Sequence, residues 1–322
     1  MGCCEANDQL LFNKKNELNT RKENEEFLNK LKNNFNNNDK SISNINKNLN
    51  MNNSDSFNEI KLYNNVLNSN FHNLKKIPMD IINTKQILEL KVIESQFIKQ
   101  NEILTINPGG LVNSNRNALD GITYFGMNNT DYINDYNFPD KETNIGKRHF
   151  EIVYDLNMNE YKIKSLLNNG LFIKITIKTI LKNNSIFSFS NTLVNCNFKT
   201  NENLNGSIIT LKILYGICEG NEYTFDSNKH SLIKIGRLKT PEIDIEINDE
   251  STSRVQTSIF YENNNWYIID GNKQEEKNKS SLNGTWLYAN EYYTIFDGMI
   301  FRAGTTCFEC NIKENKNNIN IE

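Results

Sequence analysis

Three residues near the end of this 322-residue chain could together hold a phosphate group and the peptide that carries it. Arg237, Ser253 and Asn283 each stand in a short turn between stretches rich in β-branched and aromatic residues. Arginine presents a planar fork of donors that suits phosphate oxygens. Serine adds a hydroxyl, and an asparagine amide can bond a peptide main chain. With Arg254 as a second cation, these residue types indicate a site for an anionic peptide.

The elements that must position these turns read as short β-strands. From Leu88 onward the chain alternates apolar and polar residues in short runs, with Asn- and Gly-rich breaks between them, as in ILTINPGG, HFEIVYD, IKIGR and NWYIID. Runs of this kind are typical of strands joined by tight turns. Because no helical period of useful length interrupts them, the sequence predicts an all-β fold of two tandem β-sandwiches after an N-terminal tail.

The order and spacing of the turns resemble a known family. Gly-Arg, Ser-Arg and Asn-Gly turns, followed by the strand FDGMIFRAG, resemble a forkhead-associated (FHA) domain over residues 207–314. The resemblance implies a β-sandwich that binds phosphothreonine peptides. It also implies which residues contact the peptide, namely Arg237, Ser253, Arg254 and Asn283.

Two features of this segment bear on that prediction. Gln256 stands where the family usually has a histidine that supports the binding loop, but Gln also carries a donor and an acceptor, so the role could survive. The connection before Asn283 is long and charged. It is either a solvated loop, which its charge pattern favours, or a source of steering cations from Lys273, Lys277 and Lys279.

The first half of the folded region repeats this pattern and predicts a second, degenerate FHA-like sandwich over residues 85–200. In it, SIFSFS and TLVNCNF stand where the later copy has MIFRAG and TCFECNI. Met127 replaces the arginine and Gly146 the serine, whereas His149 and Asn169 fit the family pattern. A site without its arginine and hydroxyl lacks its strongest charge-assisted bonds, although Lys147 could restore some charge. We expect this copy to serve in packing or in phosphate-independent contacts.

The N-terminus predicts a membrane tether. Gly2, Cys3 and Cys4 follow the initiator methionine, and a glycine exposed by its removal is the acceptor for myristoylation, although Ala6 departs from the usual Ser or Thr. Adjacent cysteines suit palmitoylation, and two acyl signals anchor a protein stably where one does not. Within residues 1–80, an Asn-rich tract cannot bury enough apolar surface to fold, so the sequence predicts a disordered, acylated arm.

Composition narrows the remaining classes. The net charge of −3 gives no basic field for nucleic acid. Cys307 and Cys310 have C-x-x-C spacing, but strand alternation and the lack of a complementary ligand pair argue against a metal. No nucleophile or phosphate-loop motif accompanies the three histidines, so the sequence predicts neither a catalytic residue nor a cofactor.

The sequence thus favours a non-enzymatic adaptor at the cytoplasmic face of a membrane, or otherwise in the cytoplasm. Its expected partner is a phosphothreonine-containing protein. The alternatives are a phosphate-independent scaffold or, less favoured, an enzyme or an enzyme's regulatory subunit.

Overall fold

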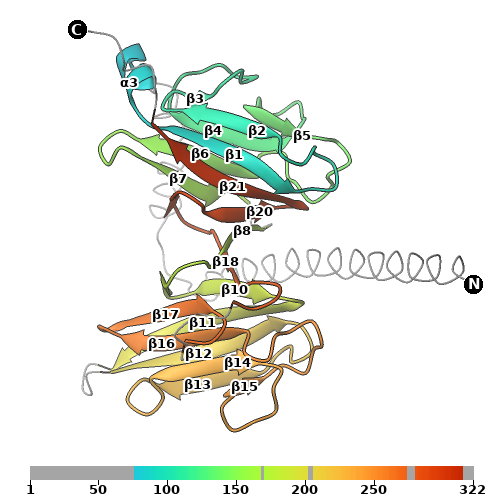
Figure 1. Ribbon diagram of the computed structural model, residues 1–322, viewed down its shortest axis with the longest axis vertical. Helices are drawn as coiled ribbons and strands as arrows, with labels where there is room; N and C mark the ends of the chain where they lie inside the picture. Colours follow the sequence, from blue (N-terminus) through green and yellow to red (C-terminus); the bar gives the residue numbers. More distant parts are fainter. Residues whose placement is uncertain (1–75, 168–169, 202–205, 274–279, 315–322) are drawn as a thin grey trace, which may run out of the picture. The chain divides into compact units, whose positions relative to one another are not determined.

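The computed structural model describes residues 76–167, 170–201, 206–273 and 280–314 (Figure 1). Apart from one short helix, α3 (Met79–Thr84), the regular elements in these ranges are β-strands, so the predicted all-β fold is confirmed. No helix among the described residues is long and apolar enough to cross a bilayer. The chain divides into two compact units, here called unit 1 and unit 2.

Unit 1 consists of Gly170–Ala289 with Met299–Arg302. One of its sheets has the strand order β15-β14-β16-β17-β9, with bounds Ile245–Glu246, Leu232–Gly236, Thr257–Glu262, Asn265–Asp270 and Thr179–Ile180. The other has the order β13-β12-β11-β10-β18-β8-β20. Its bounds are Glu222–Asp226, Gly206–Tyr215, Thr192–Asn201, Ser185–Phe189, Trp286–Tyr288, Leu171–Lys174 and Ile300–Ala303.

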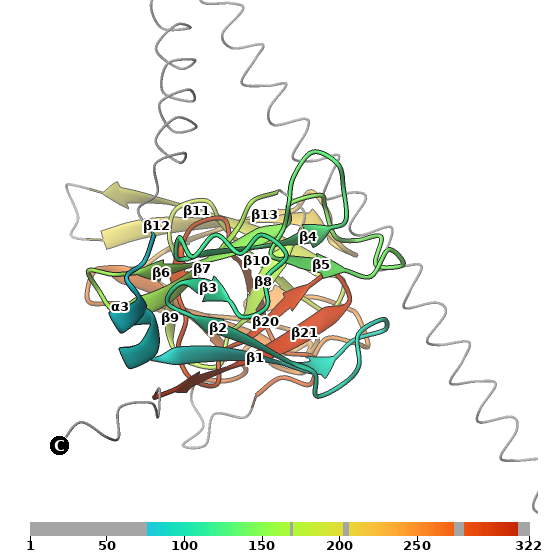
Figure 2. The same ribbon diagram turned by 90° about the horizontal axis from the view of Figure 1, so that it is seen from above.

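Unit 2 consists of the described residues up to 167 with Asn290–Gly298 and residues 303–314. Its five-stranded sheet has the order β19-β7-β6-β4-β5, with bounds Tyr293–Thr294, Glu160–Ser165, Phe150–Asp155, Ile122–Met127 and Tyr136–Phe138. The facing layer is β21-β1-β2-β3, with bounds Thr306–Lys313, Ile87–Glu94, Ile103–Asn107 and Gly110–Leu111 (Figure 2).

Alternation along the strands builds the two cores. In β1 of unit 2, Leu88, Leu90 and Val92 are fully buried while the residues between them are partly exposed. In β12 of unit 1, Ile209 and Leu211 are buried in the same way. Since successive side chains of a strand point to opposite faces, this pattern fixes which face of each strand packs inward.

Each unit is closed by strands from the other repeat. In unit 1, β12 opens the second repeat but pairs with β11, the last strand of the first, from Leu193↔Tyr215 to Asn201↔Gly206. In unit 2, β1 opens the first repeat but pairs with β21, the last strand of the second. The β17–β9 and β7–β19 pairings follow the same rule. The closing strands of the two repeats are therefore exchanged.

This exchange sets unit bounds that differ from the predicted segments 85–200 and 207–314. The stretch from Gly170 to residue 201 belongs with the second repeat, and most of residues 290–314 belong with the first. The physical reason is that equivalent closing strands have the same alternation of apolar and polar residues. They therefore offer the same pairing edge and inward face to either opening strand.

Candidate functional site

Three loops of unit 1 converge at one end of the sandwich. The loop after β14 begins at Arg237, whose backbone N–H donates to the carbonyl of Ser253 (3.1 Å) in the loop before β16. Asn283, in the loop before β18, donates from Nδ2 to the carbonyl of Ser251 (2.8 Å). The structure thus brings Arg237, Ser253 and Asn283 together, and they are called the three-loop site below.

Gly236 lets the first two loops approach each other. A Cβ atom at this position would lie 2.1 Å from the carbonyl oxygen of Arg254, far inside van der Waals contact. With no side chain in the way, β14 can end against the neighbouring loop. Arg237 then leaves the strand as an exposed side chain at the rim, and Arg254 is exposed beside it. Neither guanidinium forms an ion pair with a described carboxylate.

Gln256 fastens two of the loops from below. It is fully buried, and its Oε1 accepts a hydrogen bond from the backbone N–H of Ser253 (3.0 Å). Its Nε2 donates to the hydroxyl of Ser281 (2.7 Å) and to the carbonyl of Gly284 (3.1 Å). The amide therefore uses its donor and its acceptor together, as the sequence allowed, and holds the loops that carry Ser253 and Asn283.

A half-buried carboxylate also supports the Asn283 loop. Asp270, at the end of β17, accepts hydrogen bonds from the hydroxyl and the backbone N–H of Ser281 (2.6 and 2.9 Å) and from Oγ1 of Thr285 (2.7 Å). Sequence reasoning did not find Asp270 or Ser281. The only hint was the placement of polar residues immediately before an Asn-Gly turn.

Two serines complete the hydrogen bonding around the three-loop site. The hydroxyl oxygen of Ser253 accepts from the backbone N–H of Leu282 (2.9 Å), a bond that leaves its own hydrogen available to donate. The carbonyl of Ser251 that accepts from Asn283 also accepts from the hydroxyl of Ser190 (2.8 Å), in the turn between β10 and β11. The exchanged strands therefore help to brace the site, through a serine that the sequence did not single out.

Unit 2 repeats this loop geometry without its chemistry. The backbone N–H of Met127 donates to the carbonyl of Gly146 (2.9 Å), as Arg237 does to Ser253. His149 Nδ1 accepts from the backbone N–H of Gly146 (3.2 Å), as Gln256 does from Ser253. The positions predicted to correspond therefore occupy equivalent places; Asn169 lies outside the described residues.

The cations predicted to supplement these two sites have other contacts. On the exposed rim of unit 2, Lys147 Nζ pairs with Asp131 (2.5 Å), so its charge is already matched. In unit 1, Lys273 Nζ lies 3.3 Å from the centroid of the Phe260 ring, and burial lowers the pKa of this lysine. Lys277 and Lys279 lie outside the described residues, as do Gly2, Cys3 and Cys4.

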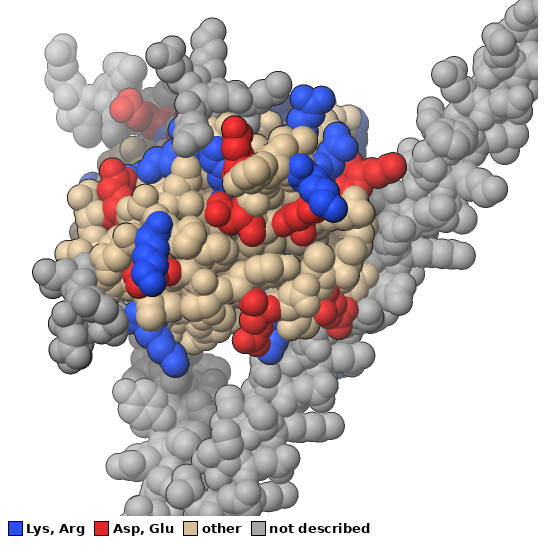
Figure 3. Space-filling view, turned by 90° about the horizontal axis from the view of Figure 1, so that it is seen from below, with Lys and Arg blue, Asp and Glu red and all other residues tan. Residues whose placement is uncertain are grey.

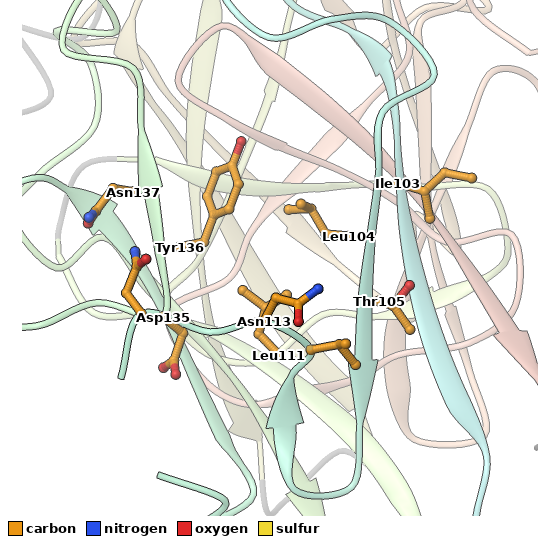
Figure 4. A pocket seen from close by; sticks show the side chains of 10 residues that line it. Ile103, Leu104, Thr105, Leu111, Asn113, Asp135, Tyr136 and Asn137 are labelled. Carbon is orange, nitrogen blue, oxygen red and sulfur yellow. The ribbon is translucent and has the colours of Figure 1, made fainter. Parts of the chain in front are cut away.

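A cavity of about 440 Å³ opens in unit 2 between β2, β3 and β5 (Figure 4). Its walls are apolar side chains, asparagine amides, Thr105 and Tyr136, with one carboxylate, Asp135. That carboxylate already accepts hydrogen bonds from Ser114, from Arg116 Nε (3.1 Å) and from the backbone N–H of Tyr124 (2.7 Å). The charged group of this cavity is therefore engaged in holding the local fold.

The side chains of Cys307 and Cys310 are buried in the core of unit 2. Cys307 and Cys310 both lie in β21 without forming a disulfide, and burial raises the pKa of Cys310. Within the described ranges, no three His, Cys, Asp or Glu side chains are grouped as metal ligands.

Charge on the molecular surface is mixed. In Figure 3, basic and acidic side chains are interspersed over the face that is shown, with uncharged surface between them. Since no broad field of one sign covers this face, local groups must provide any charge selectivity on it.

In comparisons with known proteins, one family model matches the stretch that contains this site. Residues 233–304 match the model of the FHA domain, a stretch that contains Arg237, Ser253 and Asn283. One similar solved structure is the Slr1951 protein from Synechocystis sp., 22% identical, with a TM-score of 0.19; the match covers 31% of this chain and 90% of that one. Another is Mycobacterium tuberculosis EmbR in complex with a low-affinity phosphopeptide, 19% identical, with a TM-score of 0.15, covering 30% and 23%. No curated protein matches the chain.

Proposed function

This chain carries an FHA domain, a phosphopeptide-binding interaction module, and we propose that its three-loop site binds phosphothreonine in partner proteins. The observation that carries the proposal is the convergence of Arg237, Ser253 and Asn283 on loops that hydrogen bonds hold together, with the buried Gln256 amide among the bonding groups. Loops fixed in this way need little ordering when a ligand arrives, which lowers the cost of binding.

Each of the three side chains has a separate task in this proposal. The guanidinium of Arg237 donates two parallel hydrogen bonds to phosphate oxygens and stays charged at any physiological pH. The Ser253 hydroxyl donates to a third oxygen. Asn283 keeps its Oδ1 to accept a main-chain N–H of the peptide, because its Nδ2 is already bonded to Ser251. A phosphate dianion can form one to three charge-assisted hydrogen bonds with such a cluster.

Unit 2 has a different task in this proposal. Its equivalent loops carry Met127 and Gly146, and the adjacent Lys147 is paired with Asp131, so the strong phosphate donors are missing there. We assign two tasks to unit 2. It pairs with β19 and β21, the strands that the second repeat supplies, and it makes partner contacts that do not depend on phosphate.

We further propose that the chain acts at the cytoplasmic face of a membrane, tethered by acyl groups on Gly2, Cys3 and Cys4. The support is the Met-Gly-Cys-Cys sequence itself, which offers two acylation signals. Replacing Gly2 by Ala should move the protein from the membrane fraction to the soluble fraction. A Gly2→Ala protein that stays with membranes would refute the tether.

The binding proposal is tested with the full chain on an array of phosphothreonine peptides and their unphosphorylated twins. Enrichment of phosphorylated spots, lost in Arg237→Ala but kept in the matched control Lys212→Ala, supports it. Lys212 lies on β12 and is ion-paired with Glu222. Equal binding to both peptide sets would instead favour the second candidate, a phosphate-independent scaffold.

A further inference from the structure

A basic and aromatic cluster lies directly beside the Asn283 turn in unit 1. It consists of Lys174 on β8, Trp286 on β18 and Arg302 on β20, and is called the Trp286 cluster below. Lys174 and Trp286 are direct cross-strand partners, so their side chains share one face of the sheet. The Arg302 guanidinium lies 4.8 Å from the centroid of the indole ring and the Lys174 ammonium 5.8 Å from it.

The cluster is physically joined to the three-loop site. The indole Nε1 of Trp286 donates to the carbonyl of Asn283 (3.1 Å). Lys174 extends over the next residue, Gly284, where a Cβ atom would lie 2.8 Å from its Cε. The glycine therefore allows the lysine side chain to pass beside Asn283, the residue assigned to the peptide main chain.

The charge of Lys174 is unmatched in the part of the chain that the structure describes. Its side chain is half-buried, and among the described residues no carboxylate forms an ion pair with it. A partly desolvated cation next to a peptide-binding residue attracts a carboxylate of that peptide more strongly than a fully exposed one would. Lys174 reaches this position because β8, a strand of the first repeat, pairs with β18 of the second repeat.

We propose that the Trp286 cluster extends the phosphopeptide site and selects peptides with Asp or Glu next to the phosphothreonine. The inference rests on the proposed function, since it describes the flank of the same ligand. The indole of Trp286 lies beside the lysine on the same face of the sheet, and the lysine ammonium meets the carboxylate. The expected gain is about three- to tenfold in affinity, the range of a favourable but partly solvated charge pair.

The test uses fluorescence anisotropy with the full chain and four labelled peptides. Two carry phosphothreonine with Glu or with Gln at the flanking positions, placed on both sides, and two are their unphosphorylated twins. Wild type should bind the Glu phosphopeptide several-fold more tightly than the Gln one, with the difference shrinking at high salt. Lys174→Gln should abolish that preference and leave the Gln phosphopeptide unchanged. Lys212→Gln, which removes an equal charge elsewhere in unit 1, should keep the preference.

The outcomes separate the two claims. If neither phosphopeptide binds better than its unphosphorylated twin, the proposed function fails. If the phosphopeptides bind specifically but the Glu and Gln forms bind alike, the function stands and this inference is overturned. It is overturned as well if Lys174→Gln weakens both phosphopeptides equally, because that result indicates a purely structural role for the lysine.

Discussion

Replacing Gln256 by Leu should have two effects at once: it should loosen the three-loop site and lower the stability of unit 1. The change removes the acceptor of the Ser253 N–H and a donor to the Gly284 carbonyl, while Ser281 keeps its hydrogen bond to Asp270. Each buried group left without a partner costs about 1–3 kcal/mol. The two groups together predict a loss of about 2–6 kcal/mol, a large part of the roughly 5–15 kcal/mol that stabilises a typical domain.

Unit 2 supplies the rescue for this variant. There, His149 Nδ1 accepts from the backbone N–H of Gly146 (3.2 Å), in the place where Gln256 accepts from Ser253. Gln256→His should therefore restore the acceptor and recover at least half of the lost stability. Phosphopeptide affinity should follow the same order. We expect it to fall about tenfold or more in Gln256→Leu, because roughly 1.4 kcal/mol of loop ordering is enough for that.

The assay is urea denaturation followed by tryptophan fluorescence. The chain's two tryptophans, Trp266 and Trp286, both lie in unit 1, so the signal reports on the unit that contains the site. Thr210→Val is the matched control, since it removes one exposed cross-strand hydrogen bond to Thr224 and should change stability by less than about 0.5 kcal/mol. A Gln256→Leu protein with wild-type stability and affinity would refute the role given to the buried amide.

Two further predictions test other parts of the structure. If residues 202–205 are replaced by a protease site and the chain is cut there, the two fragments should co-elute from a sizing column without denaturant, because the β11–β12 and β1–β21 pairings both join them. Fragments that separate would rule out the exchange. Burial raises the pKa of Glu151, whose carboxylate accepts a hydrogen bond from Tyr292, so ionised Glu151 costs stability above its ordinary pKa of 4.5. The melting temperature of Glu151→Gln relative to wild type should therefore rise as the pH increases from about 4 to 7, and a pH-independent difference would contradict this.

The strands and turns of the site could be predicted because their causes are local. Gly236 and Gly284 mark places where a backbone approaches closely or turns, and alternating apolar residues mark the strands between them. These patterns placed Arg237, Ser253 and Asn283 in order along the sandwich. The same spacing predicted that Met127 is equivalent to Arg237 and that Gly146 is equivalent to Ser253.

The strand exchange and the supporting residues of the site could not be predicted from the sequence, because they depend on contacts between residues far apart in the chain. The two repeats share one pattern, so nothing local states that β11 pairs with β12 and β21 with β1. For the same reason, Ser190 could not be placed beside Ser251, nor Lys174 beside Gly284. Asp270 was missed because a single carboxylate at a strand end is common and shows its role only through its partners.

The central claim is that Arg237 reads the phosphate, and calorimetric titration of one peptide in two forms tests it most directly. With the full chain, the phosphothreonine form should bind at least about 30-fold more tightly than the threonine form, as expected for charge-assisted hydrogen bonds worth roughly 1.5–3 kcal/mol each. In Arg237→Ala, most of this ratio should disappear, whereas Lys212→Ala should keep it. A wild-type protein that binds both forms alike, or an Arg237→Ala protein that keeps the full ratio, would contradict the account.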